Sequence, residues 1–165
     1  MTALQDGISA RFKLAMRRFA STVSVISTTK DGTRHAMTAT AVTSLSMAPP
    51  SLLVCVYRES RFHAALQNND LFCVNVLHED QAETSQAFSK PSALDDFDRY
   101  GWIERDGFCH LSDAQATILC QIASRVAFGS HTVFIGAVLD ANIRDSVAPL
   151  IFQNGVYGRC EPLQR

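Results

Sequence analysis

Short apolar segments that alternate with tight-turn signals constrain this chain more than any other feature of its sequence. Residues 23–29 (VSVISTT) alternate apolar and hydroxyl side chains, as a half-buried strand does. The following Lys30-Asp31-Gly32-Thr33 contains an Asp-Gly pair, which is typical of a β-hairpin turn. We therefore expect the chain to fold back here as an antiparallel hairpin.

Other segments extend this pattern along the chain. Continuous apolar runs or β-type sequences predict strands at residues 51–57, 71–77, 116–128, 132–138 and 150–158. Amphipathic spacing predicts helices at residues 8–20, 61–69 and 80–88, and residues 89–114 are mixed and loop-rich. Helices and strands alternate too weakly for a doubly wound fold. The pattern favours a closed or partly closed antiparallel β-barrel with peripheral helices.

Composition limits the classes of function. The length of 165 residues predicts a single domain over 1–165, and the 47% apolar and 19% charged residues exclude a disordered chain. A net charge of −1 gives no general attraction to nucleic acid or to an anionic membrane. No segment has the ~20 apolar residues of a membrane span, and the N-terminus lacks a signal-peptide pattern. The five cysteines include no CxxC pair, so we expect no disulfide framework, no metal site and a reducing cytoplasm.

A hydroxyl-rich stretch is the first candidate for chemistry, because the usual GxSxG, GxGxxG and P-loop motifs are absent from the sequence. Residues 36–46 (AMTATAVTSLS) carry three threonines and two serines before Pro49-Pro50. Thr38 and Thr40 face the same side of an extended chain. Hydroxyls and backbone amides at a strand end suit a planar, polar-edged heterocycle. The alternative is structural, since threonine favours strands and serine favours turns.

Ser60 and His131 are the other candidates. Ser60 precedes RFHAAL and fits a helix N-cap, where free N–H groups, with Arg58 and Arg61 beside them, favour a phosphate. A plain cap with solvated arginines is the alternative. His131 follows Gly129 at a hairpin, where a ligand can approach closely, although such a histidine is more often a surface residue. Asp95, Asp96 and Asp98 are interpreted as a solvated turn.

Taken together, these stretches resemble the small flavin reductases of two-component flavin-dependent monooxygenases, among them the reductase partner of hydroxyphenylacetate hydroxylase. The matching pieces occur in family order across nearly the whole chain. They are residues 12–28 (FKLAMRRFASTVSVIST), 37–60 (MTATAVTSLSMAPPSLLVCVYRES), 71–89 (LFCVNVLHEDQAETSQAFS), 129–131 (GSH) and 149–158 (PLIFQNGVYG).

The resemblance implies a mainly β fold, namely an FMN-binding split β-barrel of the antiparallel, Greek-key type with peripheral helices, usually in a homodimer. It implies oxidation of NADH or NADPH, reduction of FMN or FAD, and release of reduced flavin to a partner monooxygenase. It places the nicotinamide at His131. It also assigns cofactor binding to Thr38, Ala39, Thr40, Ala41, Thr43, Ser44 and Ser46 along the ring and ribityl chain, to Cys55, Val56, Tyr57, Arg58 and Ser60 at the ribityl and phosphate groups, and to Asn75 near the flavin.

Two positions depart from the family pattern. Many members have Gly-Asp-His where this chain has Gly129-Ser130-His131, so a carboxylate that could orient the histidine is absent. Many also have a small hydroxyl residue at the position of Phe62. The alternatives to a flavin reductase are an oxidoreductase on the same barrel that retains its FMN and a non-catalytic flavin-binding module.

Overall fold

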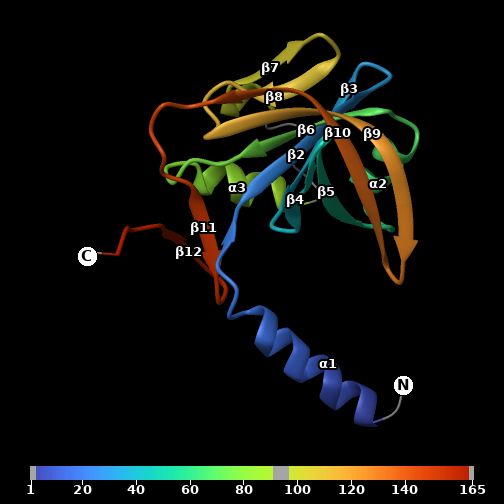
Figure 1. The fold of residues 1–165 in the computed structure, drawn as a ribbon, viewed down its shortest axis with the longest axis vertical. Coiled ribbons are helices and arrows are strands. Elements are labelled where there is room, and N and C mark those ends of the chain that lie inside the picture. The colour runs from blue at the N-terminus through green and yellow to red at the C-terminus, as the bar shows by residue number, and fades with distance from the viewer. Residues whose placement is uncertain (1–2, 91–96, 164–165) are drawn as a thin grey trace.

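The hairpin expected around Asp31-Gly32 is present and opens a mainly β fold (Figure 1). The structure is a computed structural model that describes residues 3–90 and 97–163. Its helices are α1 (Ala3–Met16), α2 (Arg61–Gln67), α3 (Ala82–Phe88) and the 3₁₀ helix η2 (Phe97–Tyr100). Its strands are β1 (Ser21–Thr22), β2 (Ser24–Lys30), β3 (Thr33–Ala39), β4 (Val42–Met47), β5 (Pro50–Tyr57), β6 (Leu71–Val76), β7 (Trp102–Arg105), β8 (Phe108–Leu111), β9 (Ala116–Phe128), β10 (His131–Ile143), β11 (Leu150–Gln153) and β12 (Val156–Arg159).

Seven of these strands form the main sheet in the order β3-β2-β6-β9-β10-β5-β4. Every neighbouring pair in it is antiparallel, so the expected antiparallel organisation is confirmed. The edge strands β3 and β4 are consecutive in the chain and are joined through Thr40 and Ala41. The sheet therefore brings the two ends of the hydroxyl-rich stretch to its two opposite edges.

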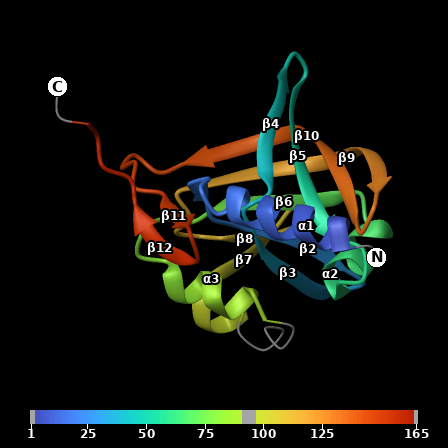
Figure 2. The ribbon, with the colours of Figure 1, turned by 90° about the horizontal axis from the view of Figure 1, so that it is seen from below.

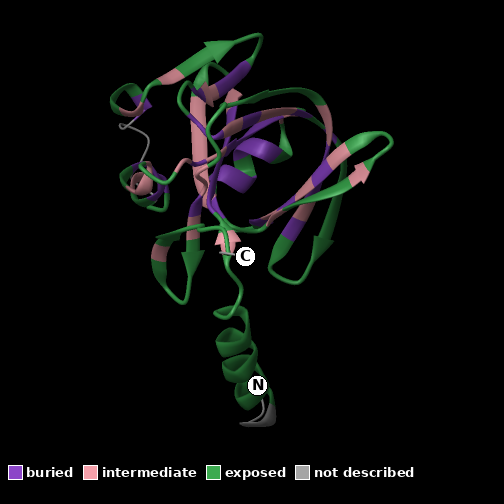
Figure 3. Ribbon diagram, turned by 60° about the vertical axis from the view of Figure 1, so that its left-hand side comes forward, coloured by how far each residue is buried: buried purple, intermediate pink, exposed green. Residues whose placement is uncertain are grey.

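The larger hydrophobic core lies between the main sheet and α2. Phe62 and Leu66 of α2 pack with Phe72 of β6, Phe134 of β10 and Val54 of β5, and all are at most 4% exposed. Figure 3 shows this burial along the strands and on α2, whereas α1 is exposed. Burial of Phe62 explains why an apolar residue stands at this position: its ring anchors the start of α2 to the sheet.

A second core lies under α3, η2 and the β7–β8 hairpin. The rings of Phe88, Phe97 and Trp102 form its aromatic centre, with centroids 5.1–5.2 Å apart. Their edge-to-face and tilted arrangement is one that aromatic rings prefer. This cluster fixes the end of α3 and the start of η2 beside β3.

Several predicted boundaries were wrong. The helix expected at residues 8–20 ends at Met16, so Phe19 and Ala20 lie outside it. The single strand expected at residues 150–158 is the β11–β12 hairpin, which turns at Asn154-Gly155. The loop-rich region 89–114 contains the β7–β8 hairpin, which turns at Asp106-Gly107. Asp95 and Asp96 lie outside the described residues.

The five cysteines are free thiols. Burial raises the pKa of Cys109 and of Cys120 to about 12, and it raises the pKa of Cys73 further. These thiols are therefore neutral core groups rather than nucleophiles. Within the described ranges, none of the helices has the length and apolar character needed to cross a membrane.

Candidate functional site

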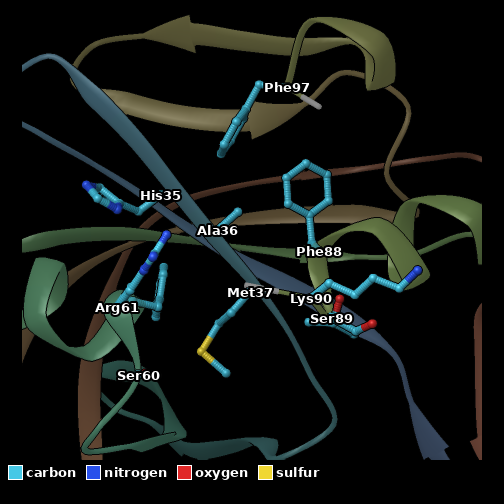
Figure 4. A pocket seen from close by; sticks show the side chains of 11 residues that line it. His35, Ala36, Met37, Ser60, Arg61, Phe88, Ser89, Lys90 and Phe97 are labelled. Carbon is cyan, nitrogen blue, oxygen red and sulfur yellow. The ribbon is translucent and has the colours of Figure 1, made fainter. Parts of the chain in front are cut away.

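A cavity of 300 Å³ lies between β3, the start of α2, the end of α3 and the start of η2 (Figure 4). Four separate parts of the chain supply its walls. Among the described residues, its lining consists of His35, Ala36, Met37, Thr38, Ser60, Arg61, Phe62, Phe88, Ser89, Lys90 and Phe97. Two of the predicted binding residues, Thr38 and Ser60, are thus brought into one cavity although they are distant in sequence.

The cavity is electropositive. Arg61 extends from α2 toward His35, and Lys90 lies at the opposite wall (Figure 4). Burial, with a smaller effect of Lys30, lowers the pKa of His35, so the positive charge near neutral pH comes from Arg61 and Lys90. No acidic side chain occurs among the described residues of the lining. Such a set of donors fits the phosphate of a nucleotide.

The Thr38 hydroxyl has a defined direction. Its Oγ1 donates to the carbonyl oxygen of Ser85 in α3, 2.7 Å away. The Ser85 side chain is fully buried and hydrogen bonds to the hydroxyl of Tyr157 in β12 at 2.8 Å. Because the Thr38 proton is used in this way, the oxygen offers the cavity acceptor lone pairs only.

Ser60 is the predicted N-cap of α2. Its Oγ accepts from the His63 backbone N–H at 3.1 Å and donates to the Tyr57 carbonyl at 2.7 Å. The capping prediction is confirmed. The hydroxyl proton is committed to Tyr57, so a phosphate near Ser60 would be held through Arg61, Lys90 and backbone amides rather than through this hydroxyl.

The rest of the hydroxyl-rich stretch lies outside the cavity lining. Thr40, Ala41, Thr43 and Ser44 are exposed on or beside the β4–β5 hairpin, which projects from the sheet (Figure 2). The Ser46 hydroxyl accepts from the Ala48 backbone N–H at 3.0 Å. This hairpin exposes hydroxyl groups together with the apolar side chains of Leu45 and Met47, and its contact with a flavin stays a prediction.

Four of the predicted binding residues make packing contacts or hydrogen bonds within the protein itself. Ala39 and Val56 point into the larger core, and the Cys55 backbone N–H donates to the Ala41 carbonyl at 3.1 Å. Asn75 is fully buried: its Nδ2 donates to the Val25 carbonyl and the Ser27 hydroxyl, and its Oδ1 accepts from the Leu111 backbone N–H. These bonds use both donors of the Asn75 amide, which indicates a structural role that joins β2, β6 and β8.

Tyr57 and Arg58 belong to a second cavity. It has a volume of 400 Å³ and is lined by Tyr57, Arg58, Glu59, His63, Gly129 and Ser130. His131 lies beside it at the first position of β10 and is exposed. The Arg58 backbone N–H donates to the Ser130 carbonyl at 2.9 Å, which fastens the end of β5 to the β9–β10 turn.

Sequence reasoning missed His35 and Lys90 of the first cavity. Both lie in segments without a recognisable binding motif, and only the packing of α3 against β3 brings them to Ser60. Ser89 lines the cavity beside Lys90 and is the last residue of the stretch 71–89 that resembles the reductase family. This resemblance was the sequence signal available for the part of the cavity formed by Ser89 and Lys90.

Comparison with known proteins identifies the family of the chain. The flavin reductase like domain family matches residues 16–161. The reductase component of an FADH(2)-dependent resorcinol hydroxylase from Rhizobium sp. (strain MTP-10005) is 42% identical over 161 residues, which cover 95% of this chain and 90% of that one.

Solved structures show the same fold. The styrene monooxygenase flavin reductase from Pseudomonas putida S12 is 32% identical, with a TM-score of 0.83 over 93% of this chain and 99% of that chain. The NADH:FAD oxidoreductase SgcE6 from Streptomyces globisporus C-1027, in complex with NAD and FAD fragments, is 28% identical with a TM-score of 0.87 over 93% of each chain. Because the family model matches residues 16–161 and the Rhizobium reductase component covers 95% of the chain, the chain belongs to the flavin reductase like domain family.

Proposed function

We propose that the protein is an NAD(P)H:flavin oxidoreductase that reduces FMN or FAD and releases the reduced flavin to a separate monooxygenase. The observation that carries this proposal is the cavity that joins Thr38 and Ser60 to Arg61 and Lys90 in a chain of this family. The names of the related proteins support it, because they include reductase components of oxygenase systems.

Arg61 and Lys90 would hold the flavin phosphate, and the segment from Thr38 to Ser46 would lie along the ring and the ribityl chain. Thr38 suits an N–H or O–H of the flavin, because its hydroxyl presents lone pairs to the cavity. His131 would contact the nicotinamide nucleotide, and Tyr57 and Arg58 of the neighbouring cavity would reach the ribityl and phosphate groups of the flavin.

The chemistry requires little acid or base from the protein. Hydride transfer from a nicotinamide to a flavin would be chemistry that the two nucleotides supply when bound. The chain has to orient the two rings and limit the access of water. The exposed surface of the β4–β5 hairpin is compatible with a flavin that binds and leaves as a substrate.

The whole molecule fits the same proposal. A seven-stranded antiparallel sheet whose edge strands are joined through Thr40 and Ala41 supports a split β-barrel of the Greek-key type, in a single domain over residues 1–165. Free thiols at all five cysteines support a location in the reducing cytoplasm. The exposed apolar face of α1 supports a homodimer.

The test is the oxidation of NADH and of NADPH, followed at the nicotinamide absorbance, with FMN, FAD, riboflavin or no flavin. We expect turnover that depends on added flavin and a purified protein that releases its flavin on dialysis. Turnover without added flavin, by a protein that stays yellow, would instead favour a retained-flavin oxidoreductase. Flavin binding without any turnover would favour a binding module.

A further inference from the structure

His131 faces Tyr57 across the β5–β10 strand pair. The two residues are direct partners in the antiparallel register, at the last position of β5 and the first of β10. Their ring centroids lie 5.6 Å apart at an interplanar angle of 54°. Because both residues are exposed, burial does not fix the imidazole, and its orientation depends on the contacts that it makes.

Ser130 supplies the second contact. Its Oγ lies 2.9 Å from Nδ1 of His131, which is hydrogen-bond distance. Within residues 3–90 and 97–163, Nδ1 is the His131 nitrogen that has a hydrogen-bond partner, and Nε2 has none. A serine hydroxyl can donate or accept, so it holds the ring without adding a charge.

Tyr57 is itself held in place. Its hydroxyl donates to Oε2 of Glu59 at 2.9 Å, and this bond with the carboxylate raises the pKa of Tyr57. The carboxylate of Glu59 thus contacts the far end of the Tyr57 ring. The Arg58 backbone bond to Ser130 ties the same strand end to the turn that carries His131.

We propose that Ser130 and Tyr57 are positioning residues for His131. They hold the imidazole by Nδ1 and by one ring face, and they leave Nε2 for the nicotinamide nucleotide. The inference rests on the proposed function for the identity of that ligand.

The test is a double-mutant cycle with steady-state kinetics. We expect Ser130→Ala and Tyr57→Ala each to raise the KM for NADH or lower kcat by about five- to tenfold, which is the loss of one neutral hydrogen bond or ring contact. The affinity for flavin should stay unchanged in Ser130→Ala. Ser130→Thr keeps the hydroxyl and should retain wild-type kinetics, and Tyr57→Phe keeps the ring and should fall between wild type and Tyr57→Ala.

The combination with His131→Ala separates positioning from a general structural effect. If Ser130 and Tyr57 act through His131, their substitution changes nothing further once the imidazole is gone. Ser112→Ala, in the exposed turn after β8, is the matched control and should behave as wild type. Equal losses in the presence and absence of His131 would overturn the proposal, as would unchanged kinetics for both alanine variants.

Failure of the proposed function would be visible separately, as a wild-type protein that oxidises neither NADH nor NADPH with any flavin. The positioning of His131 is then judged from the binding of NAD⁺ by titration calorimetry. A lower affinity for NAD⁺ in Ser130→Ala and Tyr57→Ala than in wild type supports the inference. Equal affinity of the three proteins contradicts it.

Discussion

Arg61 is the residue whose charge most directly distinguishes a phosphate site from a general apolar cavity. A charge-assisted hydrogen bond contributes about 1.5–3 kcal/mol, and solvent around an exposed arginine reduces this. We expect Arg61→Gln to weaken the binding of FMN about three- to tenfold and to leave riboflavin, which lacks the phosphate, unaffected. Fluorescence titration with both flavins measures this difference.

The matched control is Arg105→Gln, an exposed arginine of β7 outside the cavity. It should bind both flavins as wild type does. An equal loss of affinity for FMN and riboflavin in Arg61→Gln would assign this arginine to the shape of the cavity rather than to the phosphate.

His63 predicts a dependence of stability on pH. Its Nε2 lies 2.8 Å from Thr132 Oγ1 and 3.2 Å from Gln67 Nε2, and burial, followed by the charge of Arg58, lowers its pKa. With a folded pKa below the unfolded value of about 6.5, the unfolded chain binds more protons, so stability falls as the pH drops from about 6.5 toward the folded pKa. Urea unfolding at pH about 7 and about 5.5 should show this fall in wild type and a smaller fall in His63→Gln.

Residues of the site were predictable where their role is local. Ser60 caps α2 because its own side chain reaches the His63 backbone N–H three residues ahead, and this pattern is visible in the sequence. Lys90 and His35 join the cavity through packing of segments far apart in the chain, which no local pattern encodes. Asn75 shows the reverse, because a polar residue in an apolar strand can satisfy the backbone of a neighbour as readily as it can bind a ligand.

At the scale of elements, one local signal accounts for three hairpins. Asp31-Gly32, Asp106-Gly107 and Asn154-Gly155 all have positive φ at both positions, as tight hairpin turns require. The first was predicted from its sequence, and the other two were missed. Residues 89–114 lack clear strand alternation around Asp106, and the segment at 150–158 was interpreted by its apolar content alone.

Gly136 tests how closely β10 packs on the core. A Cβ at this position would lie 2.5 Å from Cζ of Phe72 and 2.9 Å from Cβ of Cys120. Both neighbours are fully buried, so relief requires movement of β6 or β9. We expect Gly136→Ala to lower the free energy of unfolding by about 1–3 kcal/mol, measured by urea denaturation.

Gly158 in β12 provides the control, because a Cβ there meets nothing within 4 Å. Gly158→Ala should leave stability unchanged or raise it slightly. A Gly136→Ala variant as stable as wild type would show that the sheet accommodates a methyl group between β10 and Phe72.

At the scale of the whole molecule, the antiparallel, mainly β organisation could be predicted because strand alternation and turn residues are local. The surroundings of α1 could not. Its spacing predicted an amphipathic helix, yet each of residues 5–16 is exposed and the helix extends away from the sheets (Figure 1). An isolated helix of this length is marginally stable in water, so its apolar face needs a partner.

A second copy of the chain is the partner expected for a homodimer, and Phe12 is the residue that tests it. The side chain is 64% exposed, so Phe12→Ser costs the single chain little. Burial of one phenylalanine contributes about 1.5–3 kcal/mol, and a two-fold interface counts it twice. We therefore expect the dissociation constant of the dimer to rise at least about 100-fold, measured by sedimentation equilibrium.

Lys13→Ala, on a neighbouring exposed position of α1, should leave the dimer intact. A wild-type protein that sediments as a monomer, or a Phe12→Ser variant that dimerises as tightly as wild type, would place the partner of α1 elsewhere.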